Sequence, residues 1–80
     1  MKYVMMYDKN DCFLPYMLTY VNEEGKILKW TYWVSSVQEA CSNDLYEAGE
    51  PTPLGGLARY TSIAEAATIE ELQLLLMLEN

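Results

Sequence analysis

The segment VNEEGK, Val21–Lys26, constrains the fold of this chain more than any other, because it predicts a tight β-hairpin. A type I turn that ends in a bulge needs a residue with left-handed backbone geometry, and Gly25 supplies it. The turn is closed if Asn22 and Lys26 face each other across it. We therefore expect a central hairpin about Asn22–Gly25, with a strand on each side.

The two strands beside this turn carry apolar side chains that alternate between two faces. Closing the turn in this way pairs Val21 with Ile27, and the later pairs then follow one by one. One face is expected to be continuous and apolar, with Tyr16, Leu18, Tyr20, Leu28, Trp30 and Tyr32. The other face is mixed and holds Met17, Thr19, Lys29 and Thr31 together with Val21, Ile27 and Trp33.

Other segments extend this sheet. Lys2–Tyr7 is a β-prone run that adds a third strand, and the polar residues Asp8–Asp11 form its turn. Pro15 predicts that the second strand starts at an edge or a bulge, since proline cannot donate to the ladder. Gly49–Gly56 is a loop punctuated by proline and glycine, and Leu57–Tyr60 is expected to be a short strand after it.

The capping-box pattern, Ser or Thr followed three residues later by Glu, occurs three times in the last 45 residues of the chain. The serine or threonine oxygen accepts an amide proton of the first helical turn, so each copy predicts a helix start. The copies are Ser36 with Glu39, Ser62 with Glu65, and Thr68 with Glu71. They predict a helix from Val37, a short helical turn at Ile63–Ala67 and a helix at Ile69–Leu78.

The first helix has two possible ends. If it runs to Ala48, Gly49 stops it and Asp44 lies in its apolar stripe as a functional buried carboxylate. If it ends near Asn43, no acid is buried. We favour the early end, because buried unpaired acids are rare and Asn-Asp often terminates helices. These patterns predict a single α+β domain over residues 1–80, with an antiparallel sheet of three to four strands and two to three short helices packed on one face.

The net charge of −7 lies entirely in the C-terminal part of the chain. Acids and bases balance within residues 1–29, whereas Arg59 is the only base in residues 30–80. An acidic surface repels nucleic acid and anionic membranes and attracts basic proteins. We therefore expect a protein partner with a basic surface, no direct nucleic-acid contact and no membrane contact. The alternative is that the charge only keeps a small domain soluble. Because no signal-peptide pattern is present, we expect a cytoplasmic protein.

The sequence offers little for catalysis or metal binding. Without histidine, a serine or cysteine nucleophile lacks its usual base. Cys12 and Cys41 have no CxxC spacing, and two isolated cysteines do not make a zinc site. We expect both thiols to be reduced and buried, although a Cys12–Cys41 disulfide remains an alternative. We expect no enzyme activity, no catalytic residue, no metal and no cofactor.

Aromatic and leucine side chains point to an interface. Trp33, on the mixed face of the hairpin, is the aromatic side chain expected to be most exposed. One face of the last helix is expected to join the core through Ile69, Leu72 and Leu76. Another side of that helix carries three more leucines: Leu74, Leu75 and Leu78. A helix that is apolar all round must be covered by its own domain or by a partner.

In bulk character the chain is similar to small phage-encoded inhibitors such as anti-CRISPR proteins, being short, acidic, free of catalytic residues and α+β in build. The resemblance implies a non-enzymatic protein that docks on a basic surface of a larger partner, such as a nucleic-acid-binding protein. It assigns no role to any residue. From the residues themselves, the partner contacts are expected at Glu39, Glu47, Glu50, Glu65, Glu70, Glu71 and Trp33.

Two other functions remain open. The chain can be a self-associating accessory domain that forms a homodimer through Leu74, Leu75 and Leu78. It can also be a small enzyme or ligand binder that uses the Gly49–Gly56 loop as a lid.

Overall fold

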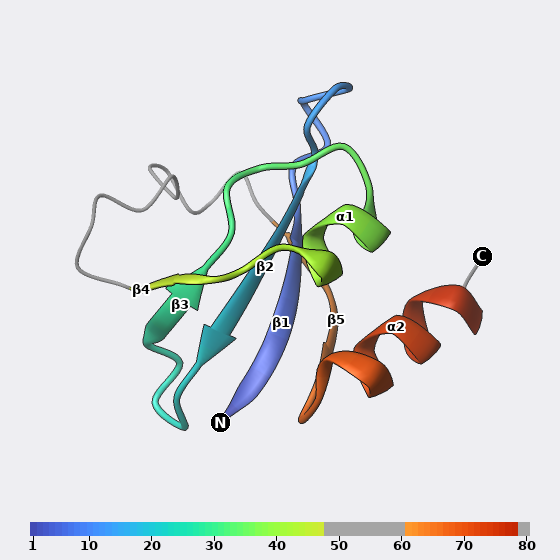
Figure 1. Cartoon of the computed structure of the whole chain (residues 1–80). Coiled ribbons are helices and arrows are strands. Elements are labelled where there is room, and N and C mark those ends of the chain that lie inside the picture. Colours follow the sequence, from blue (N-terminus) through green and yellow to red (C-terminus); the bar gives the residue numbers. More distant parts are fainter. Residues whose placement is uncertain (48–60, 79–80) are drawn as a thin grey trace.

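A computed structural model describes residues 1–47 and 61–78 of the chain. These residues form an α+β fold with an antiparallel sheet in the order β4-β3-β2-β1-β5, and the helices lie against the sheet (Figure 1). The elements are β1 (Lys2–Tyr7), β2 (Tyr16–Val21), β3 (Ile27–Trp30), α1 (Val37–Ser42), β4 (Tyr46–Glu47), β5 (Thr61–Ala66) and α2 (Ile69–Leu78). The fold class is as predicted, but the sheet has five strands rather than three to four. The predicted loop Gly49–Gly56 and strand Leu57–Tyr60 lie outside the described residues.

The hairpin turn forms as predicted. Gly25 has a φ of 85°, in the left-handed region. Its N–H donates to the Asn22 carbonyl at 3.0 Å, and the Asn22 N–H donates to the Lys26 carbonyl at 2.9 Å. The Asn22 side chain also accepts a hydrogen bond from the Lys26 N–H at 2.9 Å. The turn is therefore closed by both the backbone and a side chain.

The pairing beyond the turn differs from the prediction. Val21 pairs with Ile27, as expected, but Tyr20 then pairs with Lys29. Leu28 is the extra residue of a β-bulge, so the partners of Lys29 and Trp30 move by one position. Tyr16 bridges Val34, two positions beyond the Tyr32 that was expected. Because strand side chains alternate, this shift exchanges the faces of Lys29 and Trp30.

The continuous apolar face predicted for the hairpin is consequently wrong. Thr31 takes the place opposite Leu18 that was expected for Trp30. The Thr31 N–H donates to the Leu18 carbonyl at 2.9 Å, and the Thr31 hydroxyl accepts from the Leu18 N–H at 3.0 Å. Trp30 packs with Met17 on the other face of the sheet. Both faces of the hairpin are therefore partly apolar.

Pro15 precedes β2, the central strand of the sheet, so the predicted edge position is wrong. The ladder needs no N–H from Pro15, because pairing starts at Tyr16, whose N–H donates to the Val34 carbonyl at 3.1 Å. The Pro15 carbonyl accepts from the Asp8 N–H at 2.9 Å and closes the β1–β2 connection.

The segment Thr61–Ala66 is a strand, which corrects the helical turn predicted at Ile63–Ala67. It forms β5 and pairs antiparallel with β1. An ion pair of 2.9 Å between Lys2 Nζ and Glu65 Oε1 joins the two strands. A capping residue contributes only about 1 kcal/mol. Pairing with β1 and burial against the core outweigh that local preference here.

The first helix confirms the early end. The Ser36 hydroxyl accepts from the Glu39 N–H at 3.1 Å, and α1 stops at Ser42 with Asn43 as its C-cap. Asp44 is exposed, so it is not a buried functional carboxylate. The Glu39 carboxylate accepts from the Ser35 hydroxyl at 2.8 Å instead of closing the box on the Ser36 amide.

The last helix has the predicted bounds. The Thr68 hydroxyl accepts from the Glu71 N–H at 3.1 Å and caps α2. The chain thus contains two capped helices in its described part, one fewer than the three starts that the repeated pattern predicted.

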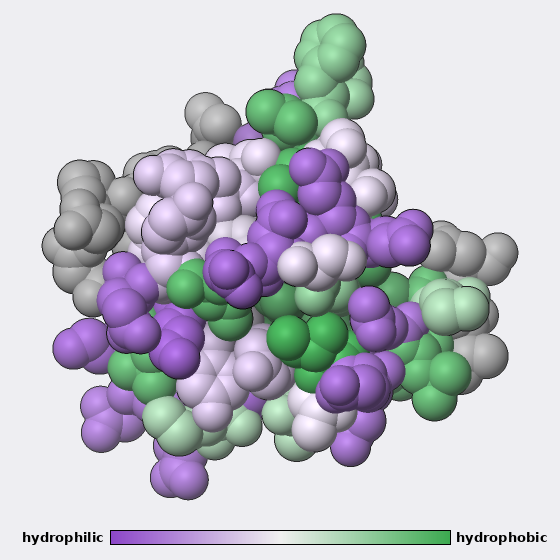
Figure 2. Space-filling model, in the orientation of Figure 1, coloured by the Kyte–Doolittle hydropathy of each residue, from purple (hydrophilic) through white to green (hydrophobic). Residues whose placement is uncertain are grey.

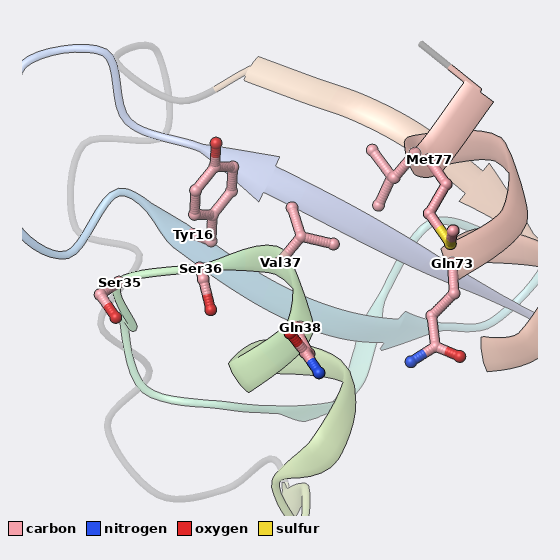
Figure 3. Close-up of a pocket in the computed structure, with 8 residues that line it drawn as sticks. Tyr16, Ser35, Ser36, Val37, Gln38, Gln73 and Met77 are labelled. Atoms are coloured by element: carbon pink, nitrogen blue, oxygen red, sulfur yellow. The ribbon is translucent and has the colours of Figure 1, made fainter. Parts of the chain in front are cut away.

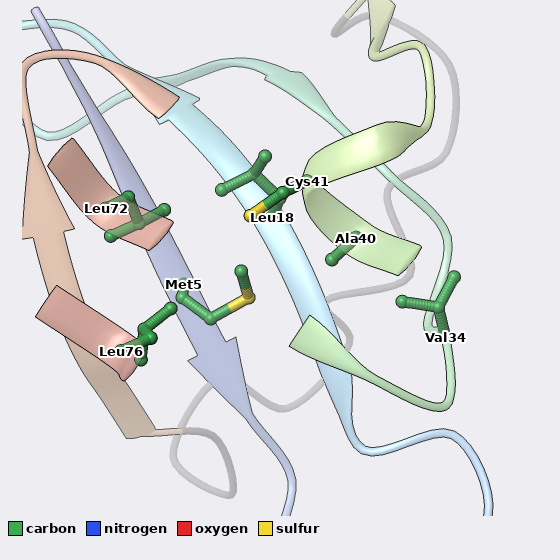
Figure 4. Close-up of a cluster of buried hydrophobic side chains, with 7 residues drawn as sticks. All are labelled: Met5, Leu18, Val34, Ala40, Cys41, Leu72 and Leu76. Carbon is green, nitrogen blue, oxygen red and sulfur yellow. The ribbon is translucent and has the colours of Figure 1, made fainter. Parts of the chain in front are cut away.

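The main core lies between the sheet and both helices. Its buried members are Met5, Leu18, Val34, Ala40, Cys41, Leu72 and Leu76. Figure 4 shows Leu72 and Leu76 projecting from α2 toward Met5 of β1, with Cys41 of α1 beside Leu18 of β2. A second cluster, formed by Met17 and Trp30, lies on the opposite face of the sheet. The helices therefore cover one face, as predicted.

Replacing Gly25 by alanine is expected to destabilise the fold by about 1 kcal/mol, because a Cβ disfavours left-handed backbone geometry. No heavy atom lies within 4 Å of where that Cβ would be, so the cost is conformational and not a clash. Urea unfolding followed by tryptophan fluorescence measures it. Gly25→Asn is the control and should cost less, since asparagine tolerates this geometry. Equal stability of Gly25→Ala and the parent would contradict the assigned turn.

Candidate protein-interaction surface

The outer side of α2 is apolar and exposed. Leu74, Leu75 and Met77 are 59%, 43% and 73% exposed, whereas Leu72 on the inner side is completely buried. The core needs only the inner stripe, so the outer side chains contribute little to folding. An apolar surface that is not needed by the domain itself is typical of a contact site. We call Leu74, Leu75 and Met77 the outer α2 face.

A groove between the two helices adjoins this face. It has a volume of about 670 Å³. Figure 3 shows Val37 and Gln38 of α1 on one side, Gln73 and Met77 of α2 on the other, and Tyr16 at one end. Its lining residues are Tyr16, Ser35, Ser36, Val37, Gln38, Gln73, Leu76 and Met77. Met77 belongs to both the groove and the outer α2 face, so the two form one continuous surface.

The helices carry negative charge only. α1 contains Glu39 and α2 contains Glu70 and Glu71, all of them exposed, and neither helix has a lysine or arginine. Figure 2 shows hydrophobic atoms gathered over α2 with hydrophilic groups beside them. We call the exposed surface of α1 and α2 the helix layer. It is an apolar surface with carboxylates at its border.

The structure does not gather all the predicted acidic residues on this surface. Glu65 belongs to β5 and pairs with Lys2 at 2.9 Å. Glu47 lies on the edge strand β4, where Lys29 is 3.8 Å away. Glu50 lies outside the described residues. Of the predicted acids in the described chain, only Glu39, Glu70 and Glu71 lie on the helices.

The predicted leucines are divided in the same way. Leu74 and Leu75 are exposed, as expected for an interface. The side chain of Leu78 lies outside what the structure describes. Met77 is the most exposed member of the outer α2 face, and sequence reasoning missed it. The signal was its helical spacing, because Met77 lies three residues beyond Leu74 and so shares its side of the helix.

Trp33 is not the most exposed aromatic residue, so that expectation is wrong. It is half-buried and packs against Met17 and Trp30. Phe13, Tyr32 and Tyr46 are exposed instead. Trp33 keeps the face of Met17 that was predicted for it, and its packing against Met17 and Trp30 covers it there.

The β1–β2 connection is a second exposed apolar feature. Phe13 and Leu14 are exposed there, and the connection projects as the hydrophobic tip at the top of Figure 2. The Asp11 carboxylate accepts from the Leu14 N–H at 3.0 Å and from the Phe13 N–H at 2.9 Å. These two hydrogen bonds lower the pKa of Asp11, since both favour the ionised form. The tip is separate from the helix layer.

The two cysteines are free thiols in different surroundings. Cys41 is buried, as expected, and burial raises its pKa. Cys12 is exposed, so the expectation that both are buried is wrong. A high pKa keeps the Cys41 thiol protonated and unreactive.

Within residues 1–47 and 61–78, no group of three or more Cys, Asp or Glu side chains is arranged to hold a metal ion. In the same part of the chain, neither helix is long and apolar enough to cross a membrane.

Comparison with protein-family models, with curated proteins and with solved structures found no match for this chain.

Proposed function

We propose that this chain is a non-enzymatic protein-binding module that docks through its helix layer on a partner with an apolar patch and a basic border. The observation that carries this proposal is the outer α2 face, whose three apolar side chains are exposed on a helix that already buries Leu72 and Leu76. Interfaces typically have an apolar centre and a polar rim. The outer α2 face and the groove supply the centre, and Glu39, Glu70 and Glu71 supply the rim.

The charge favours a basic partner. Both helices lack a basic residue, and Lys2 and Lys29 of the sheet already form ion pairs with Glu65 and Glu47. Carboxylates on one surface attract a cationic surface over a distance and speed the encounter. A nucleic-acid-binding protein offers such a surface, and carboxylates on the helices would take the place of phosphates there. Docking would then block nucleic acid from that partner.

Self-association is the second candidate, because a second copy could also cover Leu74 and Leu75. Two copies each carry a net charge of −7. Their helix layers would bring carboxylates together without a lysine or arginine to balance them, which opposes pairing at low salt. We therefore favour the heterologous partner.

The test compares capture of proteins from a host lysate by the parent chain and by matched variants. Leu74→Ser with Met77→Ser is expected to weaken the captured complex at least about tenfold, as for removal of central apolar contacts. Phe13→Ser is the control, since it removes an exposed apolar side chain from the β1–β2 connection. Equal recovery with the α2 variant would contradict the proposal.

A second comparison tests the charge. Glu70→Gln with Glu71→Gln should weaken capture more than Glu23→Gln with Glu24→Gln, which removes two adjacent carboxylates from the hairpin turn. Capture by the parent should also fall as salt rises from about 50 to 500 mM, because salt screens exposed charges. A sedimentation experiment decides between the candidates: a dimer that Leu74→Ser dissociates would favour self-association.

A further inference from the structure

A second hollow, distinct from the helix groove, lies where the chain passes from α1 into β4. It is lined by Thr31, Tyr32, Asn43, Asp44 and Tyr46 and has a volume of about 320 Å³. That volume is at the lower end of ligand pockets, which range over roughly 300–1,000 Å³. The hollow therefore suits one small group rather than a whole cofactor.

Two tyrosine rings form a corner of this hollow. The ring centroids of Tyr32 and Tyr46 are 5.0 Å apart, and the ring planes are inclined by 66°. Both rings have open surface, since Tyr32 is 57% and Tyr46 51% exposed. Trp30 braces them from behind, with centroids 4.9 Å from Tyr32 and 5.5 Å from Tyr46. The corner is thus held in place by a buried side chain.

Beside the two tyrosines, Asp44 lines the hollow and gives it a negative charge. Asp44 is exposed, and within the described chain its carboxylate forms no ion pair. Lys29 lines the neighbouring hollow, which also includes Asp44, but Lys29 lies 3.8 Å from Glu47 and is partly balanced by it. Aromatic faces and an unpaired carboxylate both attract a cation.

We infer that this hollow binds a cationic side-chain group, with the arginine guanidinium as the preferred ligand. A guanidinium can stack on one tyrosine ring while its N–H groups donate to the Asp44 carboxylate. A cation on an aromatic face needs to lie within about 6 Å of the ring centroid, and the corner offers two such rings. This inference rests on the proposed function in one respect: a basic partner would supply the arginine.

The probe is N-acetyl-arginine amide, and its neutral isostere N-acetyl-citrulline amide is the control ligand. Titration followed by the NMR signals of the tyrosine rings should show weak but saturable shifts of Tyr32 and Tyr46 with the arginine probe only. Equal shifts with the citrulline compound would overturn the inference, because they would not require a cation. Shifts that do not saturate would overturn it as well.

Variants locate the binding. Asp44→Asn should raise the Kd of the arginine probe about tenfold, as expected for loss of a charge-assisted hydrogen bond. Tyr32→Leu should raise it about threefold through loss of one ring. Glu23→Gln removes one carboxylate from the hairpin turn and should leave the Kd within about twofold. If Asp44→Asn and Glu23→Gln behave alike, the probe responds to net charge and the site is disproved.

The two proposals can fail separately. The titration uses a free amino-acid derivative and does not depend on docking of α2. A saturable titration without capture of a partner contradicts the proposed function alone. Capture through α2 without a titration contradicts the arginine site alone.

Discussion

Leu72→Ala is expected to destabilise the protein by about 3 kcal/mol, within the range of about 2–5 kcal/mol found for truncation of buried leucines. Leu72 is completely buried and belongs to the cluster in which α2 meets Met5 and Leu18. Alanine would remove contacts within this cluster and leave a cavity. For a domain of this size the melting temperature should fall by roughly 10–20 °C.

The matched control is Leu74→Ala, the same substitution two residues further along the same helix. Leu74 is 59% exposed, so its replacement should change the free energy of unfolding by no more than about 0.5 kcal/mol. Both variants keep the helix propensity gain of alanine, and the difference between them isolates burial. Thermal unfolding followed by circular dichroism measures both. Equal losses would mean that α2 does not present these faces as described.

The same pair of variants separates folding from function. Leu74 belongs to the outer α2 face, where its removal should weaken docking without unfolding the domain. Replacing Leu72 should weaken docking only because it destabilises the fold. This separation holds because the apolar side chains of α2 divide into an inner stripe and an outer face.

The parts of the fold that were predicted correctly are those in which a single local signal determines the structure. Gly25 has no competitor for the left-handed position of the turn, and Ser36 and Thr68 cap α1 and α2 as their spacing indicates. The end of α1 at Ser42 followed from the cost of burying Asp44. Each of these features is settled within a few residues of the chain.

The predictions that failed concern segments whose structure depends on residues far away in the sequence. Ser62 and Glu65 match a helix start as well as Thr68 and Glu71 do. They nevertheless lie in the strand β5, because this segment pairs with β1. A capping motif cannot show whether a neighbouring strand lacks a partner. β1 has β5 on its open edge, and Lys2 completes the pairing by an ion pair with Glu65.

The bulge at Leu28 could not be predicted from the sequence for a different reason. Tyr, Trp, Ile and Leu occur on both possible faces of the hairpin, so neither register leaves an obviously polar side toward the core. The alternation of apolar residues therefore could not choose between them. For this reason Trp30, expected opposite Leu18, instead joins Met17 on the other face. The leucines of α2 were easier, because only one stripe of a helix can face the sheet.

Trp30→Ala should be the most destabilising substitution in the hairpin, at about 3–5 kcal/mol. Trp30 is 1% exposed, and its ring braces Tyr32 and Tyr46 at the edge of the sheet. Within the described chain its Nε1 has no hydrogen-bond partner. Trp30→Phe keeps an aromatic ring and removes the unpaired N–H, so it should cost much less. Similar losses for the two variants would contradict a role based on packing.

A double-mutant cycle with Trp30→Phe then tests the bulged register directly. Met17 and Trp30 pack in one cluster, so Met17→Ala and Trp30→Phe should couple by about 0.5–3 kcal/mol. Leu18 belongs to the cluster on the other face, so Leu18→Ala and Trp30→Phe should be additive within about 0.5 kcal/mol. Without the bulge, Leu18 would lie opposite Trp30 and the two results would be exchanged. Urea unfolding of the parent, the single variants and the double variants therefore decides on which face Trp30 lies, and with it whether Tyr32 stands where an arginine site needs it.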